Sequence, residues 1–260
     1  MKILKFELKK QFRTVVIWEV IIIGILASLM LALYPIYLES KADVMKILDG
    51  FPPKFAAAFG LQVSDMFSFG GFYSFSFSYI GLIGGIMAAY LAISSFSREN
   101  SNKCSDFLLT KPVSRKSIFV QKLLSGLGLL VSTNIIFIIV AILIGQKNDT
   151  NMFLASLSLF LTQLVFFAIG IVYACFAKKV RSVSGAATMF GFIAFILSAL
   201  INILDEKALR FVAPLKYFDP AAVFADGGYE VQYAVTGIAI ILGCVTLSYF
   251  RFVNSDTKSV

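Results

Sequence analysis

The chain of 260 residues is 58% hydrophobic and 15% charged, carries a formal charge of +8 and contains no histidine. Its mean hydropathy of +0.85 excludes a water-soluble domain, which needs a charged and polar shell. The missing histidine argues against histidine-based acid–base chemistry and against the commonest zinc ligand. The three cysteines have no spacing typical of a disulfide framework or a metal cluster.

Six runs without Asp, Glu, Lys or Arg divide the chain, and each has at least 19 residues. A helix rises about 1.5 Å per residue and needs about 20 residues to cross a hydrocarbon core of roughly 30 Å. The sequence therefore predicts an all-α polytopic membrane protein with one transmembrane domain over residues 1–260. The six expected spans cover approximately residues 17–38, 72–97, 123–145, 152–177, 183–204 and 231–253.

Residues 1–16 are basic and precede the first expected span. Leu4, Leu8, Phe12 and Val15 fall on one helical stripe, whereas most of the lysines fall elsewhere. This pattern predicts an amphipathic interfacial helix in the cytoplasmic headgroup plane. A disordered basic leader is the alternative.

Two segments are expected to form outer loops. Residues 39–71 are too many for a simple turn, and the apolar stretch 55–61 after Pro52 and Pro53 predicts a short helix folded back on the membrane surface. Residues 205–230 mix charged and aromatic residues with Pro and Gly, which predicts one or two short amphipathic helices at the outer interface. The second loop is either a gate on an exit path or a plain ordered loop.

Polar and small residues interrupt the apolar spans at a few positions. Gly81, Gly85 and Ala89 form a small-xxx-small ladder that allows another helix to approach closely, either in a dimer or inside the same chain. Asn134 and Gln163 are isolated polar residues in the third and fourth spans. They are expected to form an interhelical hydrogen bond or, alternatively, to line a translocation path.

The segment 98–122 lies between the second and third spans. Ser105 can cap a short helix that Pro112 ends, and Ser114 can cap the next helix, which leads into the third span. The apolar face of the short helix is Phe107, Leu108 and Leu109. A short amphipathic helix beneath the membrane, held by two spans, is a handle for a partner.

The distribution of Lys and Arg predicts the orientation. Of the 23 basic residues, 16 fall in residues 1–16, 98–122, 178–181 and the tail from 251. By the positive-inside rule these segments are cytoplasmic, with both termini inside. The basic balance therefore marks topology and contact with anionic membrane lipids, and no motif supports a nucleic-acid partner.

The loop 98–122 resembles that of the permease subunits of type-2 ABC exporters, the bacterial ABC-2 permease family. The residues that carry the resemblance are Glu99, the acidic-apolar segment 106–109, the Lys-Pro-Val-Ser-Arg segment 111–115 and Lys122. The six-span layout and the long first outer loop agree with it, so the resemblance covers essentially the whole chain. Lys103 and Cys104 depart from the Gly-Thr pair usual in that family.

The resemblance implies a coupling helix seated in a groove of a separate ATP-binding subunit, and a second permease subunit in a homodimer or heterodimer. In this chain the implied contact residues are Glu99, Asp106, Phe107, Leu108, Leu109, Pro112, Arg115 and Lys116. The sequence has no Gly-Lys dipeptide and hence no phosphate-binding P-loop. No cofactor is therefore expected in this chain, and ATP and Mg²⁺ are expected in the partner.

These observations predict a permease that exports an apolar or amphipathic molecule, such as a peptide, a lipid-like molecule or a drug, across the cell membrane. The spans contain no cluster of buried charges of the kind found in many ion pumps. The alternatives are a membrane anchor or sensor without transport, an integral membrane enzyme, and a secondary carrier. The enzyme alternative would need convergent catalytic residues, which the sequence lacks. The carrier alternative would need a repeat between the two halves, and no convincing one is present.

Overall fold

The computed structural model describes residues 2–50, 52, 54, 58, 66–101, 114–145, 150–204 and 206–254. These residues are helical without a strand, and six helices among them are long and apolar enough to cross a membrane. The all-α polytopic fold is thus confirmed. Five of the six are α5 (Phe69–Ser101), α7 (Arg115–Gly145), α8 (Thr150–Phe176), α9 (Val183–Leu204) and α11 (Val231–Asn254).

The first membrane helix is assembled from three consecutive segments. Helix α1 (Lys2–Ala27) continues through a π-helical segment, η1 (Ser28–Leu33), into α2 (Tyr34–Glu39). The Tyr34 N–H donates to the Leu29 carbonyl five residues back, which is the wide turn of a π-helix. The separate helix α3 (Lys41–Asp49) follows. The predicted surface helix at 55–61 lies largely outside the described residues.

Helix α1 differs from the expected interfacial helix followed by a span. It runs through residues 16 and 17 without a break, because no proline or other strong helix breaker occurs there. The face of α1 that packs against the protein also differs from the expected apolar stripe. Phe12 is 60% exposed, whereas Glu7 and Gln11 are buried. The physical reason is a polar partner, Arg98, which lies on α5. The amphipathic stripe therefore places polar side chains, not Phe12, against the protein.

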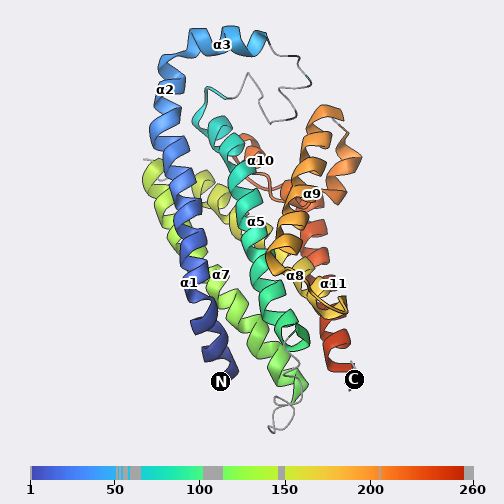
Figure 1. The fold of residues 1–260 in the computed structure, drawn as a ribbon. Coiled ribbons are helices and arrows are strands. Elements are labelled where there is room, and N and C mark those ends of the chain that lie inside the picture. Colours follow the sequence, from blue (N-terminus) through green and yellow to red (C-terminus); the bar gives the residue numbers. More distant parts are fainter. Residues whose placement is uncertain are drawn as a thin grey trace.

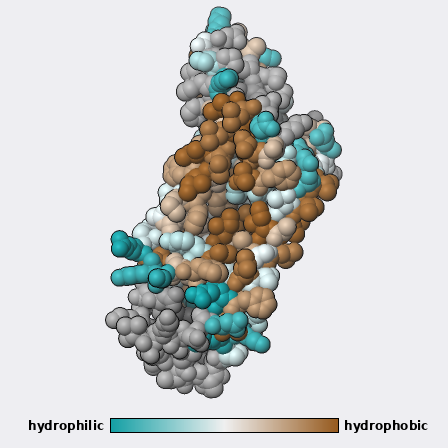
Figure 2. All heavy atoms as spheres, turned by 90° about the vertical axis from the view of Figure 1, so that its right-hand side faces the viewer, coloured by the Kyte–Doolittle hydropathy of each residue, from teal (hydrophilic) through white to brown (hydrophobic). Residues whose placement is uncertain are grey.

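Helix α5 is the central element, and α8, α9 and α1 pack around it (Figure 1). Its small residues allow this close packing. A Cβ on Gly85 would lie 2.9 Å from the Phe166 ring of α8, and one on Gly191 of α9 would lie 2.3 Å from Ile86. A broad apolar band on the flank formed by the later helices separates hydrophilic groups at the two ends (Figure 2). Such a band suits contact with lipid.

The described segment before α11 folds into three short helices, where one or two were expected. They are η2 (Lys207–Val212), η3 (Pro214–Lys216) and α10 (Pro220–Asp226). Asp219 caps α10 by accepting the Ala221 N–H, and Gly227 ends it with φ +74°. Phe224 of α10 lies directly over Gly70 at the start of α5, where a Cβ would come within 2.7 Å of the ring. The segment is therefore packed onto the bundle.

Candidate functional site

The candidate site is the end of the bundle where α1 begins, α5 ends, α7 begins and α11 ends, called here the terminal end. Both chain termini lie there (Figure 1). Asp106, Phe107, Leu108, Leu109 and Pro112 lie outside the described residues, and Glu99 lies in α5 without a described side chain. The described part of the site is therefore the base formed by the helix ends that flank residues 102–113 in the chain.

A buried ion pair joins α1 to the end of α5. Arg98 Nη1 donates to both carboxylate oxygens of Glu7 at 3.0 Å. Gln11 Nε2 donates to Glu7 Oε2 at 3.3 Å, and Arg98 Nη2 donates to Ser94 Oγ at 3.4 Å. Glu7 is only 3% exposed. Shared hydrogen bonds of this kind compensate the desolvation of a buried charge.

A buried lysine joins α7 to α5 on the other side of the base. Lys122 is 1% exposed, and its Nζ donates to the Ser95 carbonyl at 2.7 Å. The same ammonium lies 5.8 Å from the centroid of the Phe96 ring, within the range of a cation–π contact. Lys122 therefore fixes the first turns of α7 against the last turns of α5.

The first turn of α7 also reaches α1. Ser114 caps α7 as expected, since its Oγ accepts the Ser117 N–H at 3.3 Å. One turn further, Gln121 Oε1 accepts the Leu4 N–H at 3.4 Å. Of the two implied partner contacts that the structure describes, Arg115 is half-buried and Lys116 is exposed. Lys116 is thus available at this surface.

Four aromatic rings tie α11 into the same base. Phe119 of α7 lies 5.2 Å from Phe96 of α5, 5.5 Å from Tyr249 and 5.6 Å from Phe252, measured between ring centroids. Tilted and edge-on pairs at these distances stabilise beyond their apolar burial. At the terminal end, four helices are therefore joined by side-chain contacts.

Sequence reasoning missed Glu7 and Gln11 as members of this junction. A usable signal was present, because the buried residues of α1 recur at helical spacing as Glu7, Gln11, Val15, Glu19, Ile22 and Leu26, followed by Met30 of η1. Extending the apolar stripe backwards from the span would have placed both polar residues on the buried face.

The small-residue ladder lies in contacts within the chain. A Cβ on Gly81 would lie 3.6 Å from Leu215 of η3, and Gly85 faces Phe166 of α8. Ala89 is fully buried, and its carbonyl oxygen would lie 3.0 Å from a Cβ on Gly170 of α8. Gly85 and Ala89 thus serve the contact between α5 and α8.

Asn134 and Gln163 meet in the interior of the bundle. Asn134 Nδ2 donates to Gln163 Oε1 at 2.6 Å and to the Leu130 carbonyl at 2.7 Å. Both side chains are buried. Asn134 Oδ1 and Gln163 Nε2 have no hydrogen-bond partner among the described residues. The pair joins α7 to α8 and does not face the surface of the chain.

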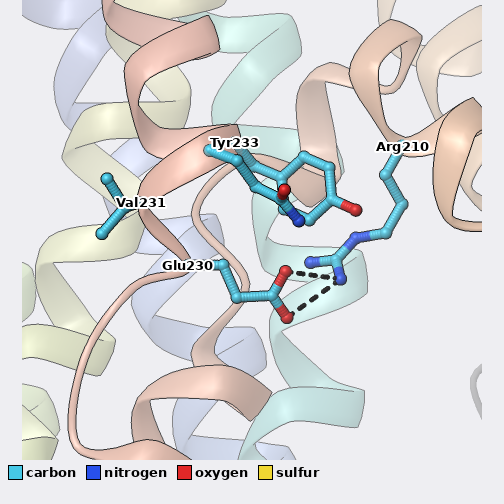
Figure 3. A pocket seen from close by; sticks show the side chains of 5 residues that line it. Arg210, Glu230, Val231 and Tyr233 are labelled. Atoms are coloured by element: carbon cyan, nitrogen blue, oxygen red, sulfur yellow. Dashed lines mark hydrogen bonds and ion pairs between the residues drawn. The ribbon is translucent and has the colours of Figure 1, made fainter.

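The opposite end carries an open hollow of about 570 Å³ that is lined by Arg210 and residues 230–233 (Figure 3). Arg210 Nη1 lies 3.0 and 2.9 Å from the two oxygens of Glu230, and its guanidinium lies 4.0 Å from the centroid of the Tyr233 ring. This pair closes the segment 210–230 on itself. No sequence motif had singled out these residues.

A second ion pair lies next to α10. Lys216 Nζ donates to Asp219 Oδ2 at 2.9 Å. Burial acts to raise the pKa of Asp219, but the Lys216 ammonium and the Ala221 N–H outweigh it and hold the pKa below its ordinary value. The carboxylate is therefore the stable form at neutral pH.

The fold and the terminal end define a class, a polytopic helical membrane protein in which the end of α5 and the start of α7 are joined by buried polar contacts. Comparison with protein families identifies it further. The family described as ABC-2 family transporter protein matches residues 1–257, and the chain belongs to that family. The chain is thus a permease component, as the resemblance indicated. Comparison with curated proteins and with solved structures gives no significant match.

Proposed function

We propose that this chain is the permease subunit of an ATP-driven exporter, and that residues 98–122 dock a separate ATP-binding subunit. The observation that carries the proposal is the base of that segment. The two helices that flank it are joined by the Lys122–Ser95 hydrogen bond of 2.7 Å. A displacement of the loop by a partner would therefore move α5 and α7 together.

The orientation follows from the charges at the terminal end. Lys5, Lys9, Lys10, Arg13 and Arg251 are exposed there. By the positive-inside rule this end and both termini face the cytoplasm, with the basic residues against anionic lipids of the cell membrane. The ATP-binding subunit then meets residues 98–122 from the cytoplasmic side.

The division of labour follows from the family and the sequence. ATP and Mg²⁺ belong to the partner subunit, and ATP-driven closure biases this subunit between inward-facing and outward-facing states. A second permease, identical or similar, completes the translocation path. In the described spans the only buried charged side chain between the terminal-end junction and the opposite end is Glu19, which favours an apolar or amphipathic cargo. Asn134 and Gln163 enter such a path only if α7 and α8 separate.

Copurification tests this proposal. The chain is tagged, extracted in mild detergent and tested for a bound ATPase of roughly 25–35 kDa, the size of one nucleotide-binding domain. We expect such an ATPase to copurify with the parent chain and to be lost from the double variant Leu108→Glu/Leu109→Glu.

The matched control places the same charge on an exposed leucine of the opposite end. Leu209 lies in η2 and is 36% exposed. The variant Leu209→Glu is expected to retain the ATPase. If the parent chain carries no ATPase, or if the double variant retains it fully, the docking proposal fails and a membrane anchor or sensor becomes the better interpretation.

A further inference from the structure

We propose that Glu7 is a positioning residue that makes α1 part of the moving unit, so that force applied to residues 102–113 reaches α1 as well as α5 and α7. This inference rests on the proposed function. The established family membership assigns no role to α1 or to Glu7. The structure supports the role through the way in which the three helices are joined.

Each pair among α1, α5 and α7 is linked by a hydrogen bond or ion pair at the terminal end. Glu7–Arg98 joins α1 to α5, Leu4–Gln121 joins α1 to α7, and Lys122–Ser95 joins α7 to α5. Three links between three helices form a closed triangle. In a closed triangle one helix cannot slide along another without breaking a link.

Breaking the Glu7–Arg98 link is costly because the Glu7 carboxylate is buried. Solvent screens and replaces exposed ion pairs, so separating them costs little. Glu7 is only 3% exposed, and pulling α1 away from α5 would leave its carboxylate buried without its main partner. The equilibrium therefore favours states in which α1 follows α5.

The position of the link fits this role. Arg98 lies in the last turn of α5, which ends at Ser101, directly before the loop 102–113. Lys122 lies two turns into α7, on the other side of the loop. The bonds that connect the helices are therefore located where a partner's push on the loop would enter the bundle.

Spin-label distances in the assembled complex test the inference. Cys104, Cys175 and Cys244 are replaced, and labels are attached through cysteines at the exposed positions 9 and 124 or 9 and 179, all outside the docking segment 98–122. The tagged chain and its captured ATPase are measured in lipid nanodiscs, without nucleotide and after trapping with ATP and vanadate. In the parent, the 9–124 distance is expected to stay constant while the 9–179 distance changes.

The variant Glu7→Gln is then compared with the parent. We expect its 9–124 distance distribution to widen to about twice the parental width and to become dependent on nucleotide, because α1 no longer follows α5. If Glu7→Gln does not assemble with the ATPase, Glu7→Asp replaces it in the experiment. The distance distribution of Glu7→Asp is expected to change in the same direction. The exchanged pair Glu7→Arg/Arg98→Glu is expected to recover most of the parental behaviour.

The control is a bidentate pair of the same chemistry at the opposite end. Glu230→Gln breaks the Arg210–Glu230 pair, which makes no link to α1, and is expected to leave both distances unchanged. A merely structural loss of stability would affect both variants alike. Only a role in transmission separates them.

The outcomes distinguish the two claims. If the parent captures no ATPase, the proposed function fails and this inference fails with it. If the parent captures an ATPase and the 9–124 distance already changes with nucleotide, or Glu7→Gln keeps the parental distances in both states, the inference alone is overturned.

Discussion

Asn134 of α7 donates a 2.6 Å hydrogen bond to Gln163 of α8, and both side chains are buried in the interior of the bundle. Such bonds between membrane helices contribute about 0.5–2 kcal/mol. The bond also needs room on a third helix, because a Cβ on Gly84 of α5 would lie 3.1 Å from Gln163 Nε2. The hydrogen bond between α7 and α8 therefore also depends on a small residue of α5.

Asn134→Leu is expected to lower the stability of the chain by about 1–2 kcal/mol, since Gln163 Oε1 loses its donor in an apolar surrounding. Thermal unfolding in detergent, followed by scanning fluorimetry, measures this loss. The double variant Asn134→Leu/Gln163→Leu is expected to be less destabilised than the sum of the single variants. Simple additivity would show that the two amides do not interact.

Gly126→Ala is expected to destabilise α7 by about 1–3 kcal/mol because of overpacking. Its Cβ would lie 2.3 Å from the Phe167 ring of α8, which is itself buried. Gly128, two residues further along the same helix, provides the control, since its Cβ would meet nothing within 4 Å. Gly128→Ala is expected to be neutral or stabilising by up to about 1 kcal/mol through helix propensity. Equal unfolding temperatures for both variants would contradict the packing of α7 on α8.

Asp219→Asn keeps a side chain that can cap α10 but removes the charge that pairs with Lys216. We expect a loss of about 1–3 kcal/mol at pH 7, since hydrogen bonds to charged groups are the stronger ones. The pKa of Asp219 is lowered in the folded state, so its stabilisation is present above the unfolded pKa and is lost as pH falls through the folded pKa.

The difference between the parent and Asp219→Asn is therefore expected to shrink as pH falls from 7 into the acidic range. Thermal unfolding across this range measures it. Asp226→Asn, at an exposed position of the same helix, is the control and is expected to leave unfolding nearly unchanged at every pH. A constant difference between the parent and Asp219→Asn would argue against the ion pair.

Cysteine labelling tests the rotation of α1. In a background without native cysteines, Phe12→Cys is expected to react with a maleimide at least about tenfold faster than Val15→Cys. An exposed thiol reacts directly, whereas a buried thiol reacts only when the structure around it opens locally. Phe12 is 60% exposed and Val15 is 2% exposed. Mass spectrometry of timed samples gives the two rates. Similar rates would place both residues on an exposed face and contradict the packing of α1.

The spans could be predicted from the sequence because hydrophobic length alone determines them. The prediction differed from the structure at positions where a polar side chain pairs with a residue far away in the sequence. In residues 1–16 the pattern predicted a helix in the headgroup plane with Phe12 on its apolar stripe, yet Glu7 is buried against the protein because Arg98, 91 residues away, meets it. No local pattern contains a partner at that distance.

The candidate site was predictable only in part, for a similar reason. The loop 98–122 was found from its motif, and Asn134 and Gln163 were found as isolated polar residues in apolar runs. Lys122 came from the family resemblance, but its bond to the Ser95 carbonyl depends on how closely α5 and α7 approach. The Arg210–Glu230 pair likewise depends on a fold that returns the segment onto itself.

The wide turn at Ser28–Leu33 has a consequence for helical phase. Tyr34 and Tyr37 lie beyond that turn and contact the Phe72 ring of α5 at centroid distances of 5.0 and 5.5 Å. A π-helical turn holds one residue more than an α-helical turn, so it offsets the direction of every later side chain. Deleting one residue at this turn would restore a regular α-helix and keep Tyr34 and Tyr37 against α5, whereas closing the turn to an α-helix without a deletion would rotate both rings by about 100° relative to α1 and carry them off α5.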